Sequence, residues 1–177
     1  MKKLLILILP ILFFFSFQPV LAQSTPSAQI LNAQYNLPYE GILPDNPLYF
    51  LKALRDNALN FLITDPVKKA NYDLLMADKR LSAASALLNK GKVDLAITTL
   101  SKSGNYFYLA VQQAADAKKQ GENVNDLLST LITASLKHQQ VVYKMEQQST
   151  GDARLVLQDS QKRIEDMQKS VELLKAK

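Results

Sequence analysis

From Pro66 onward, apolar residues recur every three or four positions along the chain. In residues 66–90 this pattern comprises Val67, Ala70, Leu74, Ala77, Leu81, Ala84 and Leu88. Three further segments up to the C-terminus keep the same alternation of three and four, which places their apolar residues on one face of an α-helix. Heptad-like spacing sustained through four segments predicts four long helices that pack side by side along their lengths.

Glycines separate these four segments. Gly91, Gly121 and Gly151 lie 30 residues apart, and each follows a stretch rich in lysine, glutamine or serine, as a left-handed residue at a helix C-terminus does. Helices of about 25 residues joined by such short connections run antiparallel to one another. The expected fold is therefore all-α, an antiparallel up-down bundle of four long helices. Gly104 lies between Gly91 and Gly121, within the second of the four long helices, and predicts a kink or frayed turn there.

The regular spacing is also compatible with an array of helical repeats. A repeat of tetratricopeptide type places two helices of about a dozen residues in each period of about 34. Here a single apolar seam fills each 30-residue interval. The pattern therefore favours the bundle over the repeat array.

A shorter helix is expected before the bundle, over residues 47–63. Asp45 and Asn46 supply an N-cap, Pro47 suits the first helical position, and leucines form an apolar stripe. Asp65 and Pro66 repeat the same start signal for the next helix. We expect the short helix to lie across one end of the bundle or along a groove. Residues 23–45 show little periodicity and form an extended segment, and residues 46–177 form the helical domain.

The first 22 residues, MKKLLILILPILFFFSFQPVLA, have the organisation of a secretory signal peptide. Two lysines precede an apolar run from Leu4 to Phe17, and Ala22 is a small residue of the kind that signal peptidase recognises. Cleavage after Ala22 makes Gln23 the first residue of the mature chain. An uncleaved N-terminal membrane anchor is the alternative, although the run is shorter than the roughly 18 residues a spanning helix needs, and Pro10 interrupts it. We expect an extracytoplasmic protein, secreted or associated with the cell envelope.

Composition limits the chemistry of this chain. The absence of cysteine excludes disulfides, a lipid-modified cysteine and covalent haem attachment. Without Lys2 and Lys3 of the predicted signal peptide, 19 basic residues face 16 acidic ones, a balance too mild and too scattered to indicate nucleic-acid binding. Charge runs such as DKR at 78–80 and KRIED at 162–166 are typical of solvated helix faces.

Catalytic motifs are absent from the sequence. It contains no GxSxG elbow, no glycine-rich phosphate loop, no HExxH pair and one histidine, so we expect no enzyme activity. A di-iron bundle needs Glu-x-x-His on two helices, which this chain lacks. His138 stays a weak candidate for a metal or haem ligand, with Met76, Met145 or Met167 as its partner. A lone histidine on an apolar stripe is more often a packed residue, so we expect no cofactor.

The last helix has two possible partners. Its sequence, LVLQDSQKRIEDMQKSVELLKAK, carries a heptad seam that could pair with a second subunit or another protein. Packing within its own bundle is the simpler expectation. Membrane contact is expected only if the signal segment is retained.

Residues 37–56, LPYEGILPDNPLYFLKALRD, followed by ITDPVKKANYDLLMADKRLSAASALLNKG, resemble an exported bacterial helical family, domain of unknown function five-six-six-seven. Glu40 and Asn46 depart from the family pattern. The resemblance covers residues 35 to about 118 and implies an extracytoplasmic helical domain without established activity or catalytic residues. The matching residues are Pro38, Tyr39, Gly41, Leu43, Pro44, Asp45, Pro47, Tyr49, Phe50, Leu51, Lys52, Asp65 and Pro66.

This motif has two interpretations. As architecture, Gly41 supplies a positive φ, Pro44 stiffens the chain, and Asp45 or Asn46 caps the helix. Leu37, Tyr39, Ile42 and Leu43 then fold back on the bundle, with Phe50 and Phe107 in its core. As a binding lip, its residues contact a partner instead. The lip would comprise Pro38, Tyr39, Gly41, Pro44, Asp45, Pro47, Tyr49 and Phe50.

Two functions follow from these patterns. The first is an exported, non-enzymatic structural or protein-interaction module of the bacterial cell envelope. The second is an extracytoplasmic sensor or carrier that binds metal or haem through His138.

Overall fold

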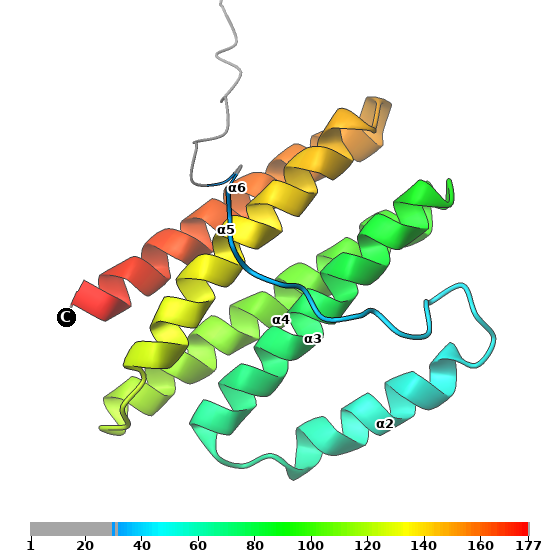
Figure 1. The fold of residues 1–177 in the computed structure, drawn as a ribbon. Helices are drawn as coiled ribbons and strands as arrows, with labels where there is room; N and C mark the ends of the chain where they lie inside the picture. Colours follow the sequence, from blue (N-terminus) through cyan, green and yellow to red (C-terminus); the bar gives the residue numbers. More distant parts are fainter. Residues whose placement is uncertain (1–29, 31, 177) are drawn as a thin grey trace, which may run out of the picture.

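The structure, a computed structural model, describes residue 30 and residues 32–176, and all of its regular elements are helical (Figure 1). The fold is a helical bundle, as the sequence predicts. Four long helices form its body, and a shorter helix precedes them. In chain order the helices are α2 (Tyr49–Leu62), α3 (Pro66–Asn89), α4 (Val93–Lys119), α5 (Asn125–Gln147) and α6 (Gly151–Ala176).

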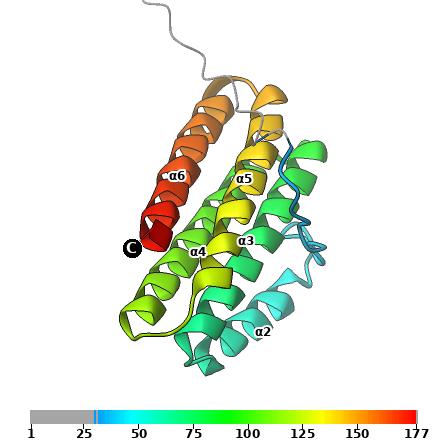
Figure 2. The same cartoon turned by 60° about the vertical axis from the view of Figure 1, so that its left-hand side comes forward.

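The long helices form two hairpins that lie side by side. α3 packs against α4, and α5 packs against α6, each pair antiparallel (Figures 1 and 2). Between the hairpins, α3 adjoins α5 and α4 adjoins α6, whereas α4 and α5 barely touch. The connection from α4 to α5 therefore crosses the end of the bundle to the opposite corner. Short connections fix the direction of the next helix, but the packing faces decide which helices become neighbours.

Helix boundaries follow the predicted signals closely. The Lys68 backbone N–H donates to Asp65 Oδ1 at 2.7 Å and caps α3, which opens with Pro66. Gly91, Gly121 and Gly151 adopt positive φ values of 72°, 85° and 58°. These glycines allow the chain to reverse between helices because they lack a Cβ.

α2 starts two residues later than the sequence predicts. The Leu48 backbone N–H donates to Asn46 Oδ1 at 2.8 Å, so Asn46 stabilises a turn before the helix. The helix itself begins at Tyr49.

α4 continues without a break through Gly104, so the predicted interruption there is wrong. Ser103 and Phe107, on either side of it, are buried against neighbouring helices. A glycine costs about 1 kcal/mol relative to alanine in a helix, which such packing readily offsets.

The core consists of two apolar clusters stacked along the bundle axis. Phe107, Leu128 and Val171 belong to the first, and Leu100 and Leu157 belong to the second. At the levels between them, α3, α4 and α5 contribute the buried polar residues Asp78, Ser103 and His138. We call these three residues the polar layer.

The last helix belongs to its own bundle. α6 packs against α5 and α4 and buries Leu157, Ile164 and Val171. This arrangement agrees with the intramolecular packing expected for its heptad seam. Across residues 32–176, no helix is both long and apolar enough to cross a membrane.

Candidate functional site: a strap and an outward-facing helix

Residues 32–48, which we call the strap, cross the bundle before α2 begins (Figure 1). Tyr35 packs against the first core cluster and Leu37 against the second. Farther along, Ser82 Oγ donates to the Pro38 carbonyl at 3.2 Å. The strap therefore contacts both halves of the bundle along α3.

The far end of the strap is held at the turn between α3 and α4. Asp45 Oδ2 lies 3.3 Å from Lys90 Nζ and 2.9 Å from Lys92 Nζ. Hydrogen bonds from Lys92 and Lys90 lower the pKa of Asp45. Asp45 thus links the strap to a distant turn, a role different from the helix cap that the sequence suggests for it.

Only part of the motif packs as predicted. Gly41 adopts a φ of 69°, in agreement with the predicted turn. Tyr39, however, is 79% exposed, and Ile42 is also exposed, so their expected packing on the bundle is wrong. Hydrogen bonds to backbone carbonyls explain the difference, because Lys52 Nζ donates to the carbonyls of Glu40 and Ile42. The strap is held here by its main chain, which leaves these two side chains in solvent.

None of the motif prolines, nor Leu43, is fully buried. Pro38, Pro44 and Leu43 are half-buried, and Pro47 is exposed. The predicted cleavage residues Ala22 and Gln23 lie outside the described residues.

α2 turns a polar stripe toward the bundle. Its inner residues recur at helical spacing and comprise Tyr49, Lys52, Ala53, Asp56 and Asn60. Tyr72 OH donates to the Asp56 backbone carbonyl at 2.8 Å, and Lys69 Nζ donates to the Asn60 carbonyl. Hydrogen bonds from two α3 side chains to main-chain oxygens therefore hold this helix.

The side of α2 that faces α3 carries polar and charged groups that are partly buried. Burial lowers the pKa of Lys52, and Arg80 and Lys79 on α3 lower it further, while Asp56 opposes them. Asn60 Oδ1 is buried without a hydrogen-bond partner. Apolar packing thus contributes little to the attachment of α2, unlike that of the four long helices.

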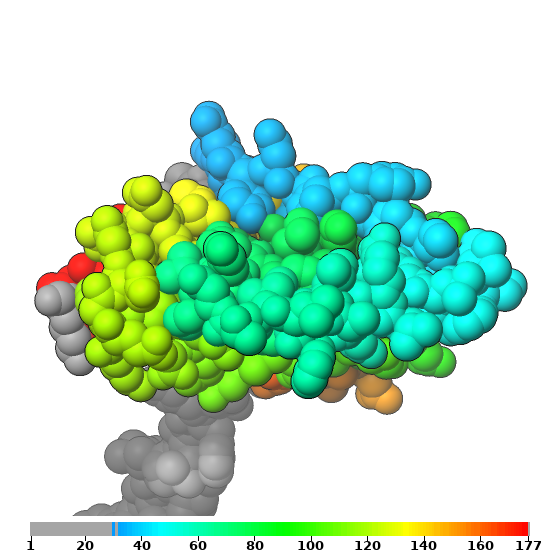
Figure 3. Space-filling model, turned by 90° about the horizontal axis from the view of Figure 1, so that it is seen from below, coloured from blue at the N-terminus to red at the C-terminus, as the bar shows by residue number. Residues whose placement is uncertain are grey.

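The opposite side of α2 is an exposed apolar surface. Phe50 is 63% exposed and Phe61 86% exposed, so the expected burial of Phe50 in the core is wrong. Figure 3 views the side of the molecule on which α2 lies, and α2 forms part of that surface. We call this surface the outer face. It comprises Phe50, Leu51, Leu54, Leu59, Phe61 and Leu62.

A hydrogen-bonded chain links the strap to the polar layer. Tyr35 OH donates to Asp78 Oδ2 at 2.7 Å, and Asp78 Oδ1 lies 2.8 Å from His138 Nε2. Ser103 Oγ donates to the Ala77 carbonyl at 2.8 Å in the same layer. Burial raises the pKa of Tyr35 strongly, and the bond to Asp78 adds to the shift. Tyr35, Asp78, Ser103 and His138 thus each make a hydrogen bond here, and the layer is an internal hydrogen-bonded network.

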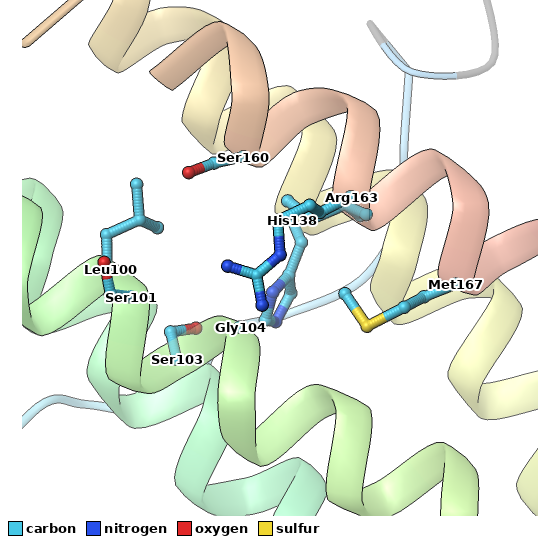
Figure 4. A pocket seen from close by; sticks show the side chains of 9 residues that line it. Leu100, Ser101, Ser103, Gly104, His138, Ser160, Arg163 and Met167 are labelled. Atoms are coloured by element: carbon cyan, nitrogen blue, oxygen red, sulfur yellow. The ribbon is translucent and has the colours of Figure 1, made fainter. Parts of the chain in front are cut away.

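A cavity of about 20 Å³ adjoins His138. Figure 4 shows His138 from α5 near Arg163 and Met167 from α6, with Ser103 and Gly104 across from them on α4. This volume suits about one water molecule and leaves no room for a haem. Within the described residues, no three histidine, cysteine, aspartate or glutamate side chains gather in a way that could hold a metal ion.

Sequence reasoning missed the burial of Asp78 and Arg80, which the charge run DKR placed on a solvated face. Both are buried, and Arg80 stacks over the Tyr106 ring at 4.5 Å from its centroid. Asp78 directly follows the core residue Ala77, which places it at the edge of the apolar seam. That position, together with a tyrosine in the preceding segment, is the only signal that could have indicated the network.

The chain belongs to a family described as Domain of unknown function (DUF5667), whose model matches residues 41–166. This match confirms the family that the motif resembles. It also extends the matched region beyond residue 118 into α6. No curated protein and no solved structure matches the chain.

Proposed function

We propose that this protein is an exported, non-enzymatic docking module of the bacterial cell envelope, and that it docks through the outer face of α2. The observation that carries the proposal is the orientation of this helix. Its polar stripe is used for attachment to α3, and its aromatic and leucine side chains point away from the bundle. Contiguous exposed apolar surface of this kind marks interaction sites in soluble proteins.

The internal polar network supports a non-enzymatic role. Tyr35, Asp78 and His138 resemble a catalytic relay in composition, but Asp78 and His138 are almost completely buried. The cavity beside His138 holds about one water, so a substrate has no access to the imidazole. The network instead joins the strap to the core.

Export is supported by the first 22 residues, which have the charged, apolar and small-residue regions of a signal peptide. The lack of cysteine is compatible with an oxidising compartment, since no free thiol is exposed there. An exported bundle with one apolar face is suited to holding another envelope component.

A site-specific photo-crosslinker tests the proposal in the bacterial host. Phe61 on the outer face and Leu173 on α6 are both exposed apolar positions, so either accepts the probe without disturbing the core. We expect discrete adducts from position 61 and few from position 173. Equal labelling from both positions, or none from position 61, would contradict the docking role of α2.

A further inference from the structure

We propose that Arg80, Lys79 and Lys52 form a binding site for a dianionic phosphate group, carried either by free phosphate or by a phosphomonoester. The site lies between α3 and the inner side of α2. It is separate from the outer face, so it adds a ligand to the docking function and does not depend on it. The inference begins from a buried positive charge that no carboxylate balances.

Arg80 carries this buried charge. It is 8% exposed, and its guanidinium forms no ion pair with any residue that the structure describes. Arg80 Nη1 donates to Met76 Sδ at 3.6 Å, and Arg80 Nε is buried without a hydrogen-bond partner. The Tyr106 ring attracts the cation but carries no charge, and a thioether sulfur is a weak acceptor. Neither contact replaces the hydration that a guanidinium loses on burial.

Two lysines add positive charge beside Arg80. Lys79 precedes it on α3, and Lys52 belongs to the inner stripe of α2; both are half-buried. Burial lowers the pKa of Lys52, and the charges of Arg80 and Lys79 lower it further, which places the three cations near one another. Lys52 Nζ donates to two strap carbonyls, which are neutral groups. The strap therefore positions this ammonium and leaves its charge unbalanced.

Asp56 is the acidic group that acts on Lys52, whose pKa it raises. Its carboxylate is already paired, because Arg55 Nη2 lies 2.7 Å from Asp56 Oδ1. Arg55 and Asp56 thus balance each other. In the described part of the chain, Lys52, Lys79 and Arg80 form no ion pair with Asp56 or another acidic side chain, so these three cations are in excess.

A phosphate dianion fits this arrangement better than a carboxylate does. A phosphomonoester carries a charge of about −1.5 to −2 at neutral pH and has three strong acceptor oxygens. The planar guanidinium of Arg80 matches two of these oxygens, and the third accepts from Lys52 on the other helix. A carboxylate has two oxygens and one charge, so it leaves one helix without a partner. A bound phosphate would therefore hold α2 against α3.

Isothermal titration calorimetry tests the inference. The chain beginning at Gln23 retains every described residue and is titrated at neutral pH and constant ionic strength. Inorganic phosphate, glycerol 3-phosphate and acetate are the three probes. We expect at least one of the two phosphates to bind, and acetate to bind at least about tenfold more weakly, because it lacks the charge-assisted bonds to one helix. The tighter of the two phosphates identifies the source as free phosphate or an ester.

Three substitutions by methionine locate the site. Arg80→Met and Lys79→Met each remove one of its charges and keep an unbranched side chain. Lys144→Met makes the same lysine change at an exposed position on α5 and is the matched control. We expect both site variants to bind phosphate at least about tenfold more weakly and the control to bind normally. Since Lys79 is only half-buried, its variant tests the site even if Arg80→Met does not fold.

Amide hydrogen exchange gives a second readout, which concerns the two helices. A phosphate that joins Lys52 on α2 to Arg80 on α3 opposes the detachment of α2. Saturating phosphate should therefore slow exchange in residues 49–62 of the unaltered chain several-fold. The same phosphate concentration should have a much smaller effect on Lys79→Met.

Four results overturn the inference. These are no binding of either phosphate by the unaltered chain, acetate binding as tight as phosphate binding, unchanged affinity in both site variants, and equal loss in Lys79→Met and Lys144→Met. Phosphate binding without slower exchange in α2 would refute the placement of the ligand between the two helices. None of these results bears on the docking proposal, which the crosslinker at Phe61 tests on the opposite side of α2.

Discussion

His138 Nε2 lies 2.8 Å from Asp78 Oδ1, and 1% and 2% of these two residues are exposed to solvent. The second oxygen of Asp78 accepts a hydrogen bond from Tyr35 OH at 2.7 Å. The strap, α3 and α5 therefore meet at one carboxyl group. Removing any one partner leaves a buried polar atom without a hydrogen bond, which costs about 1–3 kcal/mol.

Replacing Tyr35 by phenylalanine removes the bond from the strap to Asp78 and keeps the ring in place. We expect the free energy of unfolding to fall by about 1 kcal/mol, and amide hydrogen exchange to accelerate in residues 32–40. Urea unfolding and exchange followed by mass spectrometry measure the two effects. Tyr39→Phe is the control, because the Tyr39 side chain is exposed. Unchanged exchange in the strap of the Tyr35 variant would show that its hydroxyl does not hold this segment.

Asp73 should make the stability of the protein depend on pH. It is almost completely buried, and its Oδ1 has no hydrogen-bond partner. Burial raises the pKa of Asp73 above the ordinary value of 3.8, and Lys69 opposes part of this shift. The folded protein thus binds the proton more tightly than the unfolded chain. Asp73 therefore makes its full contribution to the stability of the folded protein below pH 3.8. This contribution is lost as the pH rises through the folded pKa.

Asp73→Asn removes that loss of stability. We expect the variant to match the unaltered chain at the acid end of the range and to exceed it by about 1 kcal/mol at neutral pH. Thermal melts of both proteins at a series of pH values from the acid end to neutral measure the difference. Asp159→Asn is the control, because Asp159 is exposed. A stability difference that stays constant with pH would refute the assignment to Asp73.

Gly104 offers a position at which alanine should stabilise the protein. A Cβ built there meets no atom within 4 Å, and the residue lies inside the continuous helix α4. Gly104→Ala should raise the free energy of unfolding by about 0.5–1 kcal/mol, because alanine loses less backbone entropy than glycine on forming a helix.

Gly91→Ala is the contrasting variant. Its surroundings are equally open, but its φ of 72° disfavours a side chain. We expect this change to lower the free energy of unfolding by about 1 kcal/mol in the same denaturant titration. A destabilised Gly104→Ala would mean that the helix requires the glycine for a reason other than space.

Export predicts a defined N-terminus. Intact-mass measurement of the protein isolated from its bacterial host should give a chain that begins at Gln23. Ala22→Asp should block this cleavage and leave the full-length chain in the membrane fraction, since the peptidase requires a small residue there. Ala28→Asp, six residues farther on, is the control and should be processed normally. Full-length unaltered protein in the membrane would instead support the retained anchor.

The long helices could be predicted from the sequence because their seams are repetitive and their ends carry strong local signals. Asp65 and Gly91 fix boundaries through their own hydrogen bonds and backbone conformation. α2 shows the limit of such reasoning. Its apolar stripe predicts packing toward the bundle, but the structure turns Phe50 outward and places Asp56 inside. An amphipathic pattern identifies two faces of a helix and does not say which one meets the bundle.

The candidate site was predictable in part. The motif around Gly41 gave the turn, and His138 was correctly expected to be a packed residue, since it contacts Phe107 and Asp78 in the core. The partnership of Tyr35 with Asp78 was not predictable, because it joins residues 43 positions apart. No local pattern specifies a hydrogen bond over that distance.

The sequence by itself determined the all-helical class, the number of long helices and the turns between them, since these depend on residues within a few positions of one another. The tertiary structure decided that α3 adjoins α5, that the strap enters the polar layer, and that α2 presents its apolar side outward. Those features depend on which surfaces the bundle has already buried. Tyr72 and Lys69 on α3 donate hydrogen bonds to main-chain oxygens of α2. These bonds hold the polar stripe of α2 against the bundle.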